Sequence, residues 1–437
     1  MDREVTSAVV DSREVLPGAL FFALPGEHAD GHDFVDDALG RGAGGAVVAR
    51  TLAGEAPLVE VGDTVRALMD LAADERARME DPTVVGITGA NGKTATKDLA
   101  ASVLATRFRT HASPASFNNE IGLPLTLLGA PDHTEVLVAE MGARRAGDVA
   151  LLCRIARPRI VVITNVGVAH MGIFGSWEAI VEASAEPLDA LHDDGIAIVN
   201  ADDPVVRRLG ARARARARVL TFGESHDADV RAEEIRLNDA GCPEFVLATV
   251  GEREPVELGV PGAHMVSNAL AAAACGTALG LSTAECAAGL KGARISRWRM
   301  ETFIGLDGVR VVNDAYNANP ESMAAGLRAA RWMAREGRLV AVLGHMAELG
   351  PIALAEHERL GELVVRLGVD RLITVGEQAR WIARAAVREG QRPEDVASYE
   401  GPDDAVADLR TWARRGDVVL IKGSRVAGLE RVAEALR

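Results

Sequence analysis

Short apolar stretches alternate with longer amphipathic stretches through most of the chain. From Thr83 onward, β-branched runs at Thr83–Thr88, Val136–Met141, Ile160–Asn165 and Gly195–Asn200 each precede a turn and a segment of helical period. Runs that are apolar on both faces are typical of buried parallel strands covered by helices. This pattern predicts a mostly parallel sheet with helices between its strands.

A second series of the same kind begins at Val309–Asn313 and continues at Leu339–Leu343, Arg371–Val375 and Val418–Lys422. It predicts another open parallel sheet. Between the two series, Arg218–Leu258 is more polar, and we interpret it as antiparallel strands.

The chain before Asp81-Pro82 mixes short apolar runs with Gly and Pro turns, and ends in a helical segment over Asp63–Arg78. We predict a small α/β domain there, with a boundary at Asp81-Pro82. A length of 437 residues is too great for one hydrophobic core, so two or three domains are expected.

Composition narrows the classes of function. A formal net charge of −15 argues against a surface that coats nucleic acid. The first 11 residues are charged and lack an apolar run, and no stretch is long and apolar enough to span a membrane, so we expect a cytoplasmic protein. Ala211–Arg218 alternates Ala with Arg; we interpret it as a solvated helix or loop face, with a basic patch as the alternative.

The cysteines show no CxxC spacing, which argues against a zinc site or a disulfide framework. We predict buried free thiols at Cys153, Cys242, Cys275 and Cys286.

The clearest chemical motif is Gly86–Thr94, which follows a predicted strand and opens a predicted helix at Lys93–Leu104. Turn glycines let backbone N–H groups face a phosphate, and the helix N-terminus adds its positive dipole end. Lys93 is expected to reach the β- and γ-phosphates, and the Thr94 hydroxyl to bind Mg²⁺. Ile87 stands where the general pattern has its first glycine, and a chance Gly-Lys-Thr is the alternative.

Two further polar side chains follow predicted parallel strands. Glu140 ends the strand Val136–Met141, and His170 follows the strand Ile160–Asn165. A carboxylate at the carboxyl edge of a parallel sheet is placed to bind Mg²⁺ directly or through water. The alternatives are an acidic surface turn for Glu140 and a structural histidine for His170, since imidazole is an unusual ligand of Mg²⁺.

Segments from the whole chain resemble the Mur ligase family. Those similar to its central ATPase domain are Gly89–Thr94, Phe117–Pro124, Ala139–Ala143, Thr164–His170 with Phe174–Ser176, Asn200–Pro204 and Gly262–Asn268. Those similar to its C-terminal domain are Leu343–Gly350, Lys422–Arg425 and Asn313–Met323, the last resembling a signature of the MurF branch. Those similar to the UDP-binding domain of the MurE and MurF branches are Asp11–Arg13, Pro17-Gly18 and Asp30–Phe34.

The resemblance implies three α/β domains. Residues 1–81 would hold the UDP end of the substrate, 82–297 would form a P-loop ATPase domain with a mostly parallel sheet, and 298–437 would form a Rossmann-like domain that closes with the amine. It implies an ATP-dependent, ADP-forming ligase that joins D-alanyl-D-alanine to UDP-N-acetylmuramoyl-tripeptide through an acyl phosphate, in peptidoglycan precursor synthesis. The expected partners are small molecules, without nucleic acid or membrane insertion, and the expected state is a monomer.

The resemblance also assigns residues, which we carry over one by one. ATP would contact Gly89, Ala90, Asn91, Gly92, Lys93, Thr94, Asn268, Arg299 and Asp314. Mg²⁺ would be held by Thr94, Glu140 and His170, and catalysis would depend on Lys93, Glu140 and His170. The other substrates would contact Ser12, Arg13, Asn118, Asn119, Tyr316, Asn317 and Asn319, with Ser12 and Arg13 at the uridine diphosphate.

Two positions depart from the family pattern. Ser184 stands where Mur ligases generally have a carbamoylated lysine, and a hydroxyl supplies no such negative charge. His345 stands where the family motif more often has an acidic residue. The general base that the amine needs is not identified; His264 and His345 are candidates by residue type alone.

Three functions follow as hypotheses. The first is the peptidoglycan ligase, favoured by the Ser12-Arg13 site. The second is a related amide ligase of a secondary-metabolite pathway with another acid or amine, favoured by Ser184 and His345. The third is a nucleotide-binding protein without turnover, which predicts damage to Lys93 or Thr94 that the sequence does not contain.

Overall fold

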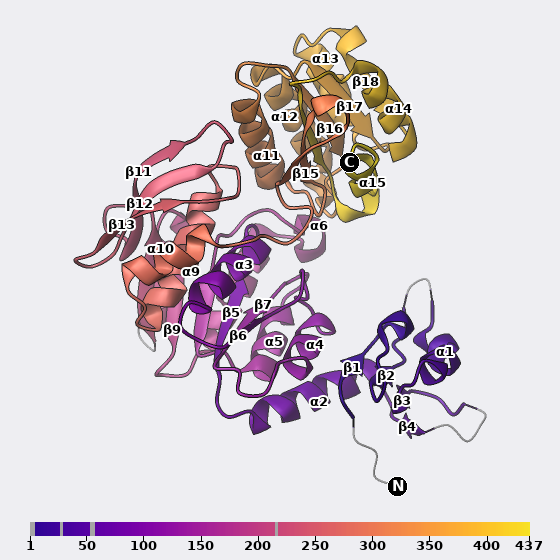
Figure 1. The fold of residues 1–437 in the computed structure, drawn as a ribbon, viewed down its shortest axis with the longest axis vertical. Coiled ribbons are helices and arrows are strands. Elements are labelled where there is room, and N and C mark those ends of the chain that lie inside the picture. The colour runs from indigo at the N-terminus through magenta and orange to yellow at the C-terminus, as the bar shows by residue number, and fades with distance from the viewer. Residues whose placement is uncertain (1–4, 27–28, 53–56, 215–216) are drawn as a thin grey trace.

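The computed structural model describes residues 5–26, 29–52, 57–214 and 217–437. Within these ranges the chain forms three α/β units, each built on its own sheet, which follow one another along the sequence (Figure 1). The central unit lies between the other two. The predicted class, α/β with mostly parallel sheets, is confirmed.

The N-terminal unit is a parallel sheet of four strands in the order β1-β2-β3-β4. Its elements are β1 (Ala8–Val9), β2 (Leu20–Phe22), α1 (Val35–Gly40), β3 (Gly45–Val48) and β4 (Leu58–Glu60). Phe21 and Phe22 are both buried but on opposite faces, because side chains alternate along a strand. Phe21 packs with α1, whereas Phe22 packs with Leu68 of the next helix, α2 (Thr64–Arg78).

Helix α2 joins the N-terminal unit to the central one. Asp63 caps its first turn by accepting a hydrogen bond from the Arg66 backbone N–H (2.9 Å). At its other end the buried Arg76 guanidinium donates to the carbonyl oxygens of Ala156 (3.0 Å) and Pro82 (3.3 Å). These bonds attach the C-terminal end of α2 to the central unit.

The central unit contains a nine-stranded sheet in the order β13-β12-β11-β10-β9-β8-β5-β7-β6. Its strands are β5 (Thr83–Thr88), β6 (Thr110–Ala112), β7 (Val136–Glu140), β8 (Ile160–Ile163), β9 (Ile196–Asn200), β10 (Arg218–Gly223), β11 (Val230–Leu237), β12 (Pro243–Ala248) and β13 (Arg253–Glu257). The strands from β6 to β11 pair in parallel, and only β11, β12 and β13 pair antiparallel.

The prediction of antiparallel strands over Arg218–Leu258 is therefore wrong for its first strand. β10 pairs in parallel with both β9 and β11 and so extends the parallel sheet. Leu220 and Phe222 are buried in the same core cluster as the long apolar helix α9 (Met265–Ala278). Helix α8 (Pro204–Ala213) connects β9 to β10 and provides the crossover that a parallel pair requires.

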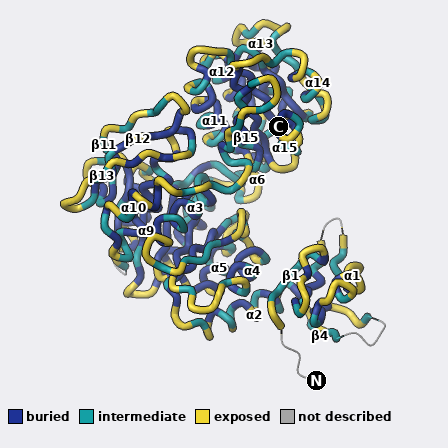
Figure 2. Tube along the Cα trace, in the orientation of Figure 1, coloured by how far each residue is buried: buried dark blue, intermediate teal, exposed yellow. Residues whose placement is uncertain are grey.

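Helices cover both faces of the central sheet, as expected for buried strands. One face carries α3 (Lys93–Leu104), α9 and α10 (Thr283–Lys291). The other carries α4 (Gly122–Leu128), α5 (Asp148–Ala156), α7 (Trp177–Asp189) and α8 (Pro204–Ala213), and a short helix, α6 (Met171–Phe174), precedes α7. Val84 faces α5 while Val85 faces α3, so neighbouring residues of β5 serve two cores. The buried interior of each unit follows its strands (Figure 2).

The C-terminal unit is a six-stranded sheet in the order β14-β15-β19-β16-β17-β18, parallel except for β14. Its strands are β14 (Glu301–Ile304), β15 (Arg310–Asp314), β16 (Leu339–Gly344), β17 (Arg371–Val375), β18 (Val396–Tyr399) and β19 (Val418–Lys422). Helices α11 (Pro320–Met333), α12 (Ala353–Arg366) and α13 (Arg380–Arg388) cover one face, and α14 (Pro402–Trp412) and α15 (Glu430–Ala435) the other. The predicted second parallel sheet is confirmed.

Three smaller predictions can be compared with the structure. The four cysteines are buried free thiols, as predicted. Of the Ala-Arg stretch, Ala211–Ala213 ends α8 and Arg218 begins β10, while residues 215–216 lie outside the described part of the chain. None of the helices in the described ranges has both the length and the apolar character needed to cross a membrane.

Candidate active site

A cavity of about 960 Å³ lies between the central and C-terminal units. Loops at the carboxyl ends of β5, β7 and β8 form one wall, because the carboxyl ends of parallel strands meet at one edge of a sheet. The loops after β15, β16 and β19 form the facing wall. The predicted ATP and Mg²⁺ residues all line this cavity: Ala90, Asn91, Gly92, Lys93, Thr94, Glu140, His170, Asn268, Arg299 and Asp314, with Gly89 adjoining them in the loop.

The phosphate loop requires glycine at two positions. Gly89 and Gly92 have φ values of +134° and +79°, which residues with a side chain rarely adopt. A Cβ at Gly92 would lie 2.2 Å from Asn268 Oδ1, and one at Gly89 would lie 2.2 Å from Thr164 Oγ1. The backbone N–H of Asn91 donates to Asn165 Oδ1 (2.8 Å), which holds the phosphate loop against the loop that follows β8.

Lys93 and Thr94 begin helix α3 beside the cavity. The Lys93 ammonium donates to the Gly89 carbonyl oxygen (2.7 Å) and to that of Ala90 (3.3 Å). Burial lowers the pKa of Lys93, and the nearby Glu140 carboxylate opposes that shift. The Thr94 hydroxyl lies 3.1 Å from Ser116 Oγ. Both predicted phosphate-loop side chains are therefore held by neutral oxygen atoms that a phosphate or a cation can replace.

Lys97, one turn further along α3, supports the loop that carries Ser116. Its buried ammonium donates to the carbonyl oxygens of Ser113 (2.7 Å) and Ala115 (2.9 Å), and forms an ion pair with Asp98 (2.7 Å). This lysine was not predicted, because the sequence gives no sign of which loop a helical lysine reaches.

We expect Lys97→Met to lower the free energy of unfolding by about 3 kcal/mol, because it leaves a carboxylate and two carbonyl oxygens without their buried partner. Calorimetry of the main thermal transition measures the effect. Lys291→Met, at the exposed end of α10, is the matched control. Equal stability of the two variants would contradict the role of Lys97.

Glu140 is the buried carboxylate of the central wall. Its Oε1 accepts a hydrogen bond from Asn118 Nδ2 (2.8 Å), while its Oε2 is buried and has no partner within the described residues. An unpaired buried carboxylate oxygen is costly unless a cation meets it. The Thr94 hydroxyl and the Glu140 carboxylate are oxygen donors of the kind that Mg²⁺ accepts.

No group of three or more His, Cys, Asp or Glu side chains within the described ranges is arranged to hold a metal ion. The two oxygen donors Thr94 and Glu140 fit a site in which the nucleotide phosphates and water complete the coordination of Mg²⁺. His170 lines the cavity but its Nδ1 is hydrogen-bonded to Glu348 Oε2 of the C-terminal unit. Burial lowers the pKa of His170, and the Glu348 carboxylate opposes that shift.

Glu348 connects the two walls of the cavity. Besides His170 it accepts a hydrogen bond from Arg144 Nη2 (2.8 Å), and its backbone carbonyl accepts one from the Gly172 N–H (2.9 Å). It belongs to the segment Leu343–Gly350, which carried part of the family resemblance, but no role was predicted for it.

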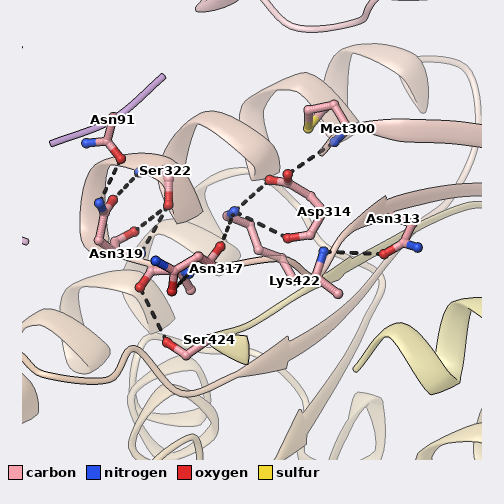
Figure 3. Close-up of polar contacts among 11 residues, drawn as sticks. Asn91, Met300, Asn313, Asp314, Asn317, Asn319, Ser322, Lys422 and Ser424 are labelled. Carbon is pink, nitrogen blue, oxygen red and sulfur yellow. Dashed lines mark hydrogen bonds and ion pairs between the residues drawn. The ribbon is translucent and has the colours of Figure 1, made fainter. Parts of the chain in front are cut away.

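Arg299 and Asp314 lie on the C-terminal side of the cavity. The Arg299 guanidinium stacks on the Tyr316 ring (4.2 Å to the centroid) and donates to Ser116 Oγ (3.0 Å). Asp314 accepts a hydrogen bond from the Met300 N–H (3.1 Å) and forms an ion pair with Lys422 Nζ (2.6 Å) (Figure 3). Ser116 thus joins the phosphate-loop residue Thr94 to Arg299.

The loop between β15 and α11 approaches the phosphate loop directly. Asn319 caps α11 by accepting a hydrogen bond from the Ser322 N–H (2.9 Å), and its Nδ2 donates to Asn91 Oδ1 (2.7 Å) (Figure 3). The Asn317 carbonyl oxygen accepts a hydrogen bond from the buried Lys422 ammonium (3.0 Å). Tyr316, Asn317 and Asn319 all line the cavity, as do Asn118 and Asn119.

Ser12 and Arg13 are not part of these walls. Ser12 is buried in the N-terminal unit, and Arg13 is exposed with its guanidinium paired to Asp11 (2.5 Å). The structure therefore brings together the predicted nucleotide residues and five of the predicted substrate residues, but leaves the predicted uridine diphosphate contacts in another unit.

The residues that departed from the family pattern lie away from the cavity walls. Ser184 Oγ donates to the Ile180 carbonyl oxygen (2.8 Å) within α7, and neither Ser184 nor His345 lines the cavity. Glu186 accepts hydrogen bonds from the backbone N–H groups of Gly147 (2.6 Å) and Ala150 (2.9 Å) at the start of α5. Of the two histidines considered as bases, only His264 lines the cavity.

Comparison with known proteins gives matches over nearly the whole chain. Three family descriptions match in order: the Mur ligase family catalytic domain at residues 4–76, the Mur ligase middle domain at 87–276 and the Mur ligase glutamate ligase domain at 298–425. The UDP-N-acetylmuramoyl-tripeptide--D-alanyl-D-alanine ligase of Mycobacterium tuberculosis is 42% identical, over 99% of this chain and 92% of the relative.

Solved structures agree with the sequence matches. A MurF structure from Acinetobacter baumannii is similar with a TM-score of 0.86 and 30% identity, over 99% of this chain and 93% of that one. A MurF ligase from Thermotoga maritima, solved in complex with ADP, has a TM-score of 0.83 and 30% identity, over 100% of this chain and 98% of that one. On these grounds the chain belongs to the Mur ligase family, and within it to the MurF group.

Proposed function

We propose that the chain is an ATP-dependent, ADP-forming ligase that joins D-alanyl-D-alanine to UDP-N-acetylmuramoyl-tripeptide, a step in the synthesis of peptidoglycan precursors. The observation that carries the proposal is the 42% identity, over 99% of the chain, to the mycobacterial ligase of that name. Its partners are these small molecules, and we place the reaction in the cytoplasm, where ATP is supplied.

The first step solves a leaving-group problem. A free carboxylate is a poor acyl donor because it would have to expel oxide, whereas an acyl phosphate expels phosphate. Transfer of the γ-phosphoryl group depends mainly on alignment and on neutralising charge. Lys93 is the cation placed for this task, since its ammonium is held by two carbonyl oxygens at the rim of the phosphate loop.

Mg²⁺, when bound, neutralises charge on the β- and γ-phosphates. We assign it to the Thr94 hydroxyl and to the Glu140 carboxylate, whose Oε2 has no partner in the described structure. The Nδ1 of His170 is hydrogen-bonded to Glu348, so its other ring nitrogen, Nε2, is the atom that could join these donors. The remaining nucleotide contacts are assigned to the cavity residues Asn268, Arg299 and Asp314.

The second step needs a site without free water. The amine of D-alanyl-D-alanine attacks the acyl carbon and phosphate leaves, but water can attack the same carbon. Contacts that join the C-terminal unit to the central unit beside the cavity include Asn319 to Asn91 and Glu348 to Arg144. These contacts hold the C-terminal wall of the cavity, to which we assign the amine, over the phosphate loop.

The acid substrate has to extend from one unit to another. Ser12 and Arg13, which we assign to the uridine diphosphate, lie in the N-terminal unit. Met69 of α2 and Asn119 also line the cavity, and we assign their side of it to the peptide portion of the acid substrate. The three domains of this scheme are residues 1–81, 82–297 and 298–437.

The alternative of a ligase with other substrates was favoured by Ser184 and His345. Neither side chain lines the cavity, so neither is expected to contact the substrates. The alternative of a protein without turnover has no support, because Lys93 and Thr94 are present and lie at the cavity.

Phosphate release with ATP, Mg²⁺, UDP-N-acetylmuramoyl-tripeptide and D-alanyl-D-alanine tests the proposal directly. We expect turnover that requires all four components, and a product with the mass of the amide. Turnover only with another acid or amine would support the alternative ligase, and binding of ATP without any turnover would contradict both.

We expect the turnover of the parent protein to be independent of added bicarbonate, because a serine hydroxyl forms no stable carbamate. The Ser184→Lys variant is expected to be no more active than the parent, since this position does not line the cavity. Both are measured as phosphate release in buffers freed of carbon dioxide and in buffers with bicarbonate. A bicarbonate-dependent rise in the activity of the lysine variant above that of the parent would contradict this prediction.

A further inference from the structure

Two carboxylates around the cavity lack a partner. Among the acidic residues that line it, Asp148, Asp203, Asp314, Glu140 and Glu348 accept hydrogen bonds from the protein. Within the described ranges, the side chains of Glu120 and Glu321 have neither a hydrogen bond nor an ion pair. Glu120 lies on the central wall, whereas Glu321 lies on the C-terminal wall, in the first turn of α11.

The Glu321 carboxylate reaches across to the phosphate loop. A Cβ added at Gly167 would lie 3.3 Å from Glu321 Oε1 and 3.1 Å from the Ala90 Cβ, so the carboxylate packs where Gly167 has no side chain. Ala90 belongs to the phosphate loop, and its carbonyl oxygen accepts a hydrogen bond from the Lys93 ammonium (3.3 Å). The Glu321 carboxylate therefore lies beside the loop to which the phosphates are assigned.

Neighbouring contacts fix this position. The capping box of α11, between Asn319 and Ser322, sets the first turn of the helix, and Asn319 also donates to Asn91 in the phosphate loop. Glu321 stands between the two capping residues in sequence, so its backbone cannot move without breaking them. The backbone of Glu321 is therefore held at the junction of the two cavity walls, while its side chain is exposed and open to a ligand.

A free carboxylate beside a phosphate loop needs an explanation, because it repels the phosphates unless a cation meets it. The protein provides no cation partner for it in the described structure. The two remaining cations are Mg²⁺ and the amino group of the incoming amine. We assigned Mg²⁺ to donors on the opposite wall, Thr94 and Glu140, whereas the family resemblance assigns the amine to the C-terminal unit, in which Glu321 lies.

We propose that Glu321 binds the amino group of the amine substrate and accepts its proton during amide formation, which rests on the function proposed above. The bound ammonium first loses one proton to water, and the neutral nitrogen then attacks the acyl carbon and becomes positively charged as the C–N bond forms. Glu321 then takes one proton from it, the bond between the acyl carbon and the phosphate oxygen breaks, and inorganic phosphate leaves. The proton on Glu321 passes to solvent after the products dissociate.

The test separates the two half-reactions. In Glu321→Gln, formation of the acyl phosphate from ATP and UDP-N-acetylmuramoyl-tripeptide is expected to continue, and hydroxylamine, which is largely unprotonated at neutral pH, is expected to trap it at the parent rate. Amide formation with D-alanyl-D-alanine is expected to fall by about 100-fold or more. In Glu321→Ala, added formate is expected to restore part of that loss.

Three further arms make the result decisive. Asp404→Asn removes an acidic residue from the first turn of α14, outside the cavity, and controls for an effect on the helix dipole alone. Equal aminolysis by Glu321→Gln and the parent, or loss of aminolysis in Glu120→Gln instead, would overturn the proposal. So would a raised requirement for Mg²⁺ with unchanged dependence on the amine. If the parent protein forms no amide at all, the proposed function fails, and not the role of Glu321.

Discussion

Replacement of Lys93 by alanine is expected to lower kcat for phosphate release by about 1,000-fold, the largest loss expected of any single cavity residue. The ammonium is the one cation of the phosphate loop, and its two present acceptors are the Gly89 and Ala90 carbonyl oxygens, which a phosphate can replace. The measurement is kcat and KM for each of the three substrates.

The Lys93→Arg variant tests whether charge alone is sufficient at this position. Arginine keeps the charge but replaces a compact ammonium by a planar fork, so it is expected to recover little of the activity. Burial lowers the pKa of Lys93 although the Glu140 carboxylate opposes that shift, so the charged form is disfavoured on balance and neither variant is expected to lower the thermal stability of the free protein. A loss of less than tenfold in the alanine variant would contradict the assignment of Lys93 to the transferred phosphoryl group.

Glu140→Gln is expected to reduce activity and to preserve or raise stability. The substitution keeps the oxygen that accepts from Asn118 (2.8 Å) and removes the charge from a buried oxygen without a partner. A buried carboxylate oxygen without a hydrogen bond costs free energy in the free protein, a cost that the attraction between Glu140 and Lys93 offsets in part, whereas Mg²⁺ requires the charge. We expect kcat to fall by about 100-fold or more.

The two readouts are made on one preparation. Melting temperatures of the parent and of Glu140→Gln are compared without ligand, and again with ATP and Mg²⁺. The parent is expected to gain the greater stabilisation from the ligands, because binding to the native state adds to stability. Equal stabilisation of both proteins would show that the Glu140 charge does not serve the cation.

The elements of the fold could be predicted where a strand is buried on both faces. The strand at Thr83–Thr88 and the helices at Lys93–Leu104 and near Asp63–Arg78 agree with the structure to within one residue. The pairing of β10 was predicted wrongly from the polar character of its segment, whereas its direction follows from α8, the crossover helix that connects it to β9. Local pattern determines the type of an element, whereas its neighbours depend on the packing of the whole unit.

The candidate site shows the same division. Side chains at the carboxyl ends of strands, such as Glu140 and Asp314, could be placed at the cavity from sequence. The contact between His170 and Glu348 joins residues 178 positions apart and crosses from one sheet to another. Its existence depends on how the two units meet, which no hydrophobic period encodes. The partner that occupies His170 was missed for that reason.

Asn319 shows how a single amide can restrict the choice of residue at a position. Its side-chain Oδ1 accepts a hydrogen bond from the Ser322 backbone N–H, and its side-chain Nδ2 donates one to Asn91 Oδ1. Serine, threonine and aspartate are also good residues at the start of a helix, but aspartate has no hydrogen to donate and the two hydroxyl side chains are shorter. The position therefore admits only asparagine if both bonds are to be kept. One side chain therefore supports both the start of α11 and the phosphate loop of another unit, so a substitution at Asn319 affects both.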